Sequence, residues 1–217
     1  MSRHQTGVFM IQERGASKNT VIAGVAGAGV VALLIAAVLF GGSLGETAVS
    51  IEDVVGSPQV EGSLPPMGGS NVDQTATGLA APTVIGVDFN GEEVRIENDG
   101  RPKAVVFLAH WCPHCQAEVP SVQRWLNDTG GVDAVDLYSV TTAVDPRRSN
   151  YPPSRWLEDE RWTVPVIRDD AASSVLTAHG NGGFPFWVFT NSDGTVALRV
   201  AGEIPINDLE EILRNLS

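Results

Sequence analysis

The stretch AHWCPHCQAEVP, from Ala109 to Pro120, decides the fold prediction because it joins an apolar run to a helix through two cysteines. The preceding residues, AVVFLA, are typical of a central buried strand. We predict a helix from Pro113 to about Asn127, with Cys112 as its N-cap and Pro113 at its first position. Free N–H groups in the first turn and the helix dipole then favour a thiolate at Cys112.

Side chains beside Cys112 have candidate roles in the same chemistry. Cys115 lies one turn into the helix and should be more buried, which suits it to resolve a mixed disulfide. His114 either stabilises the Cys112 thiolate or simply faces solvent. Trp111 is predicted to shape the site and to contact a substrate chain, whereas His110 is interpreted as a surface residue.

A second motif, GGFPFWVF from Gly182 to Phe189, places a proline directly before a predicted strand. A cis peptide bond before Pro185 would leave the Phe184 backbone free to bind an extended substrate beside Cys112. A trans turn proline is the alternative interpretation.

Composition limits the classes of function. Two cysteines exclude a multi-disulfide scaffold, and a disulfide between such close neighbours would be a weak staple but a well-placed redox switch. The formal net charge is -12 at pH 7. Because an acidic domain repels phosphate backbones, nucleic acid is not expected as a partner.

The N-terminal part predicts a membrane anchor. Val21 to Phe40 form a run of 20 residues without a charged or polar side chain, enough for a helix to cross a bilayer. Basic residues precede the run and none follows until Arg95, so residues 1–19 should be cytoplasmic. We predict an uncleaved transmembrane segment over residues 20–40, and a flexible extracytoplasmic linker over the Gly-, Ser- and Pro-rich residues 41–80.

The remaining residues, 81–217, read as one folded domain. TVIGVDF and EEVRIEN flank Asn90-Gly91 and predict a hairpin with a primed turn. Strands then alternate with helices, and a second hairpin and an amphipathic helix end the chain. This pattern predicts an α/β fold with a mixed central sheet, an N-terminal β-hairpin and flanking helices.

The two motifs together resemble the thioredoxin superfamily. The carrying residues are WCPHC followed by E-x-P, and a later G-x-P before a strand, within a resemblance that covers about residues 83–217. They are most similar to the TlpA-like, ResA-type branch of membrane-anchored bacterial disulfide oxidoreductases. The resemblance implies a thioredoxin-like fold, with Cys112 attacking, Cys115 resolving and Pro185 in the cis form.

The resemblance also assigns a role to Glu118, which matches a glutamate that this branch carries three residues past the second cysteine. Its carboxylate could exchange protons with Cys115, or it could be a solvated helix residue. Three features depart from the family. Val106 stands where many thioredoxins have a buried Asp, and Phe184 stands where Thr, Val or Ile is usual. Pro113-His114 is the dipeptide of strongly oxidising DsbA-like enzymes.

The predicted function is thiol–disulfide exchange on extracytoplasmic protein thiols and disulfides, as a reductase of TlpA-like type. A DsbA-like thiol oxidase and a copper-handling protein, with Cys112, Cys115 and a histidine as ligands, are the alternatives. A peroxidase would need a T-x-x-C motif, which does not occur. We expect no cofactor and no resident metal. The expected partners are protein thiol or disulfide substrates, a membrane redox partner, and the membrane itself through the N-terminal helix.

Overall fold

The computed structural model describes residues 49–217. The predicted cytoplasmic segment (1–19), the predicted transmembrane segment (20–40) and the first part of the predicted linker lie outside these residues. Within residues 49–217, no helix is both long enough and apolar enough to cross a membrane.

A mixed sheet forms the centre of the domain. Its six strands are, in spatial order, β2 (Val72–Asp73), β9 (Val196–Ala201), β8 (Phe186–Thr190), β5 (Lys103–Leu108), β6 (Asp136–Thr141) and β7 (Val166–Arg168). Strand β5 pairs parallel with β6 and antiparallel with β8, which confirms the predicted mixed sheet. Every residue of β5 is buried, as expected for a strand that is covered on both faces.

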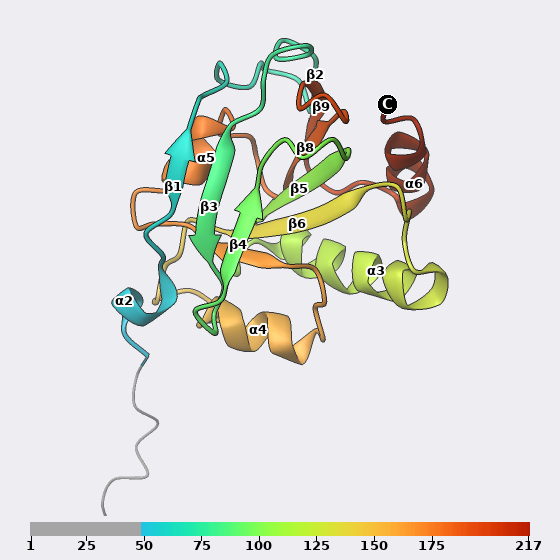
Figure 1. The fold of residues 1–217 in the computed structure, drawn as a ribbon. Coiled ribbons are helices and arrows are strands. Elements are labelled where there is room, and N and C mark those ends of the chain that lie inside the picture. The colour runs from blue at the N-terminus through green and yellow to red at the C-terminus, as the bar shows by residue number, and fades with distance from the viewer. Residues whose placement is uncertain (1–48) are drawn as a thin grey trace, which may run out of the picture. The chain divides into compact units, whose positions relative to one another are not determined.

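Helices cover one face of this sheet. Helices α3 (Pro113–Thr129), α4 (Pro153–Asp159) and α6 (Ile206–Arg214) contribute buried side chains to one hydrophobic cluster with residues of β5 and β8. In Figure 1, α3 and α6 lie on the same side of the sheet. The cluster fixes the start of α3 against the end of β5, where the cysteines lie.

A small second sheet covers the opposite face. It consists of β1 (Gln59–Glu61), β3 (Thr83–Val87) and β4 (Glu93–Ile96), and it packs there together with α5 (Ser174–Ala178). Strands β3 and β4 confirm the predicted N-terminal hairpin. The predicted primed turn is wrong, because both primed types need a positive φ at the first central residue and Asn90 does not have one, whereas Gly91 does, at 83°. Instead, the Asp88 carboxylate accepts the N–H groups of Asn90 and Glu92 and shapes a longer loop.

The predicted flexible linker is wrong for residues 49–80. This stretch contains helix α2 (Ile51–Val54), and it adds β1 to the small sheet and β2 to the edge of the main sheet. Arg199 of β9 fixes it, since its guanidinium pairs with the buried Asp73 and also donates to the Pro65 carbonyl at 2.8 Å. These contacts span more than 120 residues of sequence, so local composition gave no sign of them. Residues 49–217 form one compact unit.

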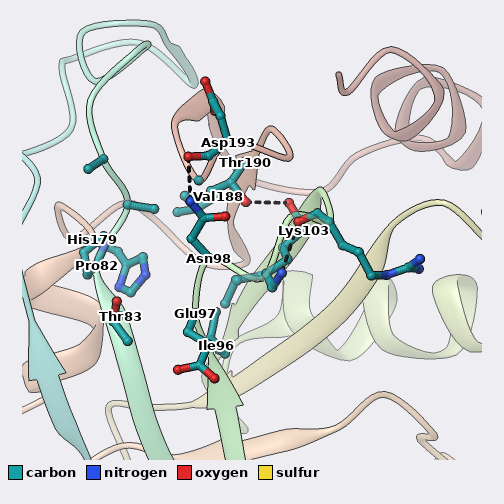
Figure 2. A pocket seen from close by; sticks show the side chains of 15 residues that line it. Pro82, Thr83, Ile96, Glu97, Asn98, Lys103, His179, Val188, Thr190 and Asp193 are labelled. Atoms are coloured by element: carbon teal, nitrogen blue, oxygen red, sulfur yellow. Dashed lines mark hydrogen bonds between the residues drawn. The ribbon is translucent and has the colours of Figure 1, made fainter.

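A cavity of about 210 Å³ lies between the β3–β4 hairpin and the main sheet. Figure 2 shows Pro82, Ile96, His179 and Val188 among the side chains around it, with Lys103 at its wall. Val188 of the second motif lines this cavity, but Cys112, Cys115 and Pro185 do not, so it is separate from the cysteine pair.

Candidate active site around Cys112 and Cys115

The two cysteines lie where strand β5 gives way to helix α3. Cys112 is the N-cap of α3 and Pro113 is its first residue, as the sequence predicts. Both cysteines are free thiols. Cys112 is 7% exposed and Cys115 is fully buried, so Cys112 is the sulfur that a partner molecule reaches first.

Burial sets the chemistry of Cys115. It raises the pKa of this thiol well above its usual range, and the nearby Cys112 and Glu118 add to the rise because a second negative charge is unfavourable there. Cys115 therefore stays a thiol at neutral pH unless a neighbouring base takes its proton. This confirms its predicted greater burial and makes it a poor first nucleophile.

Glu118 lies inside the protein, not on a solvated helix face. Its side chain accepts a hydrogen bond from Trp187 Nε1 at 2.9 Å and one from the Ile204 backbone N–H at 3.3 Å. Burial raises the pKa of Glu118 to about 7, although these two hydrogen bonds oppose the rise. A carboxyl group with such a pKa can both take and give a proton near neutral pH, next to Cys115.

His114 has a different partner from the one proposed from the sequence. Its side chain is 67% exposed, and its Nδ1 lies 2.5 Å from Oε1 of Glu203, in the loop between β9 and α6. The His114 side chain thus hydrogen-bonds to Glu203 and not to the Cys112 sulfur. Sequence reasoning missed Glu203, which lies 89 residues further along the chain and belongs to neither motif.

The second motif lies next to Cys112. The Phe184–Pro185 peptide bond is cis, which confirms the prediction for Pro185. The Cys112 thiol lies 3.7 Å from the Phe184 carbonyl oxygen. The rings of Trp111 and Phe184 meet edge to face with centroids 6.0 Å apart, so the two residues form one apolar wall beside the sulfur.

Trp111 is held in place by the loop that follows β6. Its indole Nε1 donates to the Ala143 carbonyl at 2.8 Å, and the Arg148 guanidinium lies 4.5 Å from the centre of its ring. The indole orientation is therefore fixed before any substrate binds. The predicted shape-giving role of Trp111 stays a prediction.

The interpretation of His110 as a surface residue is wrong, because it is only 1% exposed. Its Nδ1 lies 2.6 Å from the Ser149 carbonyl oxygen, and its Nε2 accepts the Asp145 N–H at 3.2 Å. This pattern assigns a neutral imidazole with the proton on Nδ1, and burial lowers the His110 pKa in the same sense. His110 thus fastens the loop that holds Trp111.

The same hydrogen bonds bear on the copper alternative. A metal at His110 would have to break one of its two hydrogen bonds to the loop. Among the residues that the structure describes, no group of three or more His, Cys, Asp or Glu side chains is placed to hold a metal ion.

The fold and the site agree with one known family. The thioredoxin-like domain family matches residues 89–217, more than half of the chain, so the chain belongs to this family. Its site is a Cys-Pro-His-Cys pair at a helix N-terminus, faced by a cis-proline loop. The predicted resemblance to the thioredoxin superfamily is confirmed.

Individual relatives are more distant. Sporulation thiol-disulfide oxidoreductase A of Bacillus subtilis is 25% identical over 91 residues, which are 42% of this chain and 54% of that protein. The chain thus matches about half the length of this curated relative.

Two solved structures show the same fold. The thioredoxin domain of a Bacteroides vulgatus thiol-disulfide oxidoreductase is 24% identical, with a TM-score of 0.50 over 65% of this chain and 97% of that one. A secreted Mycobacterium tuberculosis disulfide oxidoreductase homologous to Escherichia coli DsbE is 19% identical, with a TM-score of 0.51 over 61% and 95%.

Proposed function

We propose that the chain is a thiol–disulfide oxidoreductase that reduces disulfides of protein substrates outside the cytoplasm. The observation that carries the proposal is the arrangement of the two cysteines, one at the helix N-cap and the other buried one turn into the helix. The more accessible Cys112 caps the helix beside the Phe184 carbonyl, and the buried Cys115 lies one turn behind it next to Glu118. Membership of the thioredoxin-like family and the name of the Bacillus subtilis relative support the same class of enzyme.

The first step is attack on the substrate. Cys112, at the N-terminal end of helix α3, attacks one sulfur of a substrate disulfide as its thiolate. A new bond forms between Cys112 and that sulfur while the substrate S–S bond breaks. The second substrate sulfur leaves as a thiolate and takes up a proton.

The second step releases the substrate. Cys115 gives its proton to the Glu118 carboxylate and attacks Cys112, which breaks the mixed disulfide and frees the first substrate sulfur as a thiolate. The protein is left with a Cys112–Cys115 disulfide, and two electrons have passed to the substrate. The burial of Cys115 explains why this step needs a base, and Glu118 is the carboxyl group placed to serve.

The cis-proline loop supplies the substrate-binding edge. The Phe184 carbonyl oxygen lies beside the Cys112 sulfur, so an extended substrate segment can pair with this backbone while its cysteine reaches Cys112. Trp111 and the Phe184 ring then contact the neighbouring substrate residues. Phe184 stands where Thr, Val or Ile is usual in the family, which favours substrates with apolar side chains next to the cysteine.

The N-terminal run over residues 20–40 supports anchoring in the membrane, with the catalytic domain outside. A reductase in that position needs electrons from a membrane redox partner, since each cycle leaves it oxidised. After cell fractionation, recovery of the full-length chain in the soluble fraction alone would refute the anchor.

A thiol oxidase of DsbA-like type is the second candidate, and the Pro113-His114 dipeptide favours it. The reduction potential of the cysteine pair separates the two. We expect equilibration with glutathione and dithiothreitol buffers to give a value near or below about -270 mV, as for thioredoxin. A value between about -120 and -180 mV would contradict the reductase and support the oxidase. A reduced pair that binds copper tightly and never forms a disulfide would contradict both.

A further inference from the structure

One short segment contacts three residues of the site. Residues 202–204, between β9 and α6, bridge the cis-proline loop and the helix that carries the cysteines. The Gly202 N–H donates to the Pro185 carbonyl at 2.8 Å, and the Ile204 N–H donates to the Glu118 carboxylate. Between them, the Glu203 carboxylate binds His114, which is the residue between the two cysteines.

We propose that Glu203 is a positioning residue that makes the Cys112–Cys115 pair more reducing, because its carboxylate holds His114 by a hydrogen bond and places a negative charge beside the start of α3. The proposal rests on the function proposed above and names how that site is tuned. It also accounts for an oxidase-type dipeptide within a site of reductase type.

Thiolate stability and redox potential are linked. Anything that stabilises the Cys112 thiolate stabilises the reduced protein and makes the disulfide a stronger oxidant. Any positive charge at the start of α3 acts in this direction, in addition to the helix dipole, and a negative charge there acts against it. The Glu203 carboxylate, 2.5 Å from Nδ1 of His114, puts a negative charge next to the residue between the cysteines, where it opposes formation of the Cys112 thiolate.

Solvent limits the size of this effect. The side chains of His114 and Glu203 are 67% and 44% exposed, so water and salt screen their charges. We therefore expect a shift of the redox equilibrium, not a change of mechanism. Glu203 also acts on Glu118, because its negative charge is one of the causes that raise the Glu118 pKa.

Glu203→Gln separates charge from structure. The glutamine keeps a side-chain oxygen that can accept the His114 hydrogen bond, but it removes the negative charge. The measurement is the equilibrium in which two glutathione thiols reduce the Cys112–Cys115 disulfide to two thiols and form glutathione disulfide. We expect its constant to rise about threefold to tenfold at pH 7, and tenfold corresponds to about 30 mV.

Glu211→Gln is the matched control. Glu211 is an exposed glutamate of α6 outside the site, so this variant makes the same charge change and should keep the wild-type constant. Equal constants for wild type and Glu203→Gln, or equal shifts in Glu203→Gln and Glu211→Gln, would overturn the proposal.

His114→Ala supplies the second arm. It leaves the Glu203 charge unopposed, so the constant should fall below that of wild type, and adding Glu203→Gln should raise it again. A constant in His114→Ala that equals or exceeds the wild-type value would show that the imidazole does not oppose the Glu203 charge. If the wild-type pair formed no reversible disulfide at all, the proposed function itself would fail, which distinguishes the two claims.

Discussion

Two carboxyl groups lie near the cysteine pair, and their different environments indicate different roles. Glu118 is 3% exposed and lies next to the buried Cys115, whereas Glu203 lies at the rim and binds His114. Val106 occupies the position where many thioredoxins carry a buried aspartate. Glu118 is thus the buried carboxyl group beside the cysteine pair, and it is carried by helix α3 instead of strand β5.

The proton transfer by Glu118 can be tested by Glu118→Gln. Because the carboxylate must take the Cys115 proton, the wild-type rate of mixed-disulfide resolution should rise with pH up to about 7, the pKa to which burial raises Glu118. Glu118→Gln should resolve about a hundredfold more slowly at pH 7 and lose this pH dependence. Stopped-flow release of a thiol leaving group from a preformed mixed disulfide measures the rate.

Two findings would count against this role of Glu118. One is an unchanged rate in Glu118→Gln, and the other is a slower rate that keeps the wild-type pH profile. Near-UV circular dichroism of the variant controls for a displaced Trp187, because the glutamine oxygen can still accept the Trp187 hydrogen bond.

At this scale the sequence predicts the groups that act through local geometry. Cys112, Cys115 and Pro113 could be placed because a strand followed by a helix fixes an N-cap. His110 and Glu203 could not, because their contacts join residues that lie 35 and 89 positions apart in the sequence.

Secondary-structure elements show a similar division. The run AVVFLA and the helix after it were predictable, because burial on both faces and a proline at the first helical position leave local signs. Strands β1 and β2 are too short for a periodic pattern, with three and two residues. They exist because they pair with strands already fixed in the domain, so the sequence suggested a linker where the structure has an ordered extension.

The buried ion pair that holds this extension supports a prediction. Asp73→Asn removes the charge that faces Arg199 and leaves the guanidinium buried without its counter-ion. We expect the free energy of unfolding to fall by about 2–4 kcal/mol, measured by urea denaturation of the full-length chain. Asp128→Asn, an exposed change on α3, is the control and should stay within about 0.5 kcal/mol of wild type.

The variant Asp73→Asn also separates an ordered extension from a tether. If residues 49–80 were a flexible linker, Asp73→Asn and Asp128→Asn would unfold at the same urea concentration. A drop confined to Asp73→Asn would instead assign the extension to the folded unit, in agreement with the pairing of β2 with β9.

At the scale of the whole molecule, the fold brings three distant segments to one point. The start of α3, the cis-proline loop before β8 and the loop between β9 and α6 meet at Cys112 and Cys115. The chain as a whole is acidic, with a formal net charge of -12. The exposed Arg148 beside Trp111 is a positive charge next to the site. The overall class and the first two segments were predictable from motifs, while the third required the folded structure.

The most direct test of the central claim is the reduction of insulin disulfides by dithiothreitol, with wild-type protein and with Cys112→Ser. We predict that wild-type protein accelerates the reduction and that Cys112→Ser falls to the uncatalysed rate, because no accessible nucleophile remains. Catalysis by Cys112→Ser at the wild-type rate would contradict the assignment of Cys112 as the attacking cysteine, and with it the proposed function.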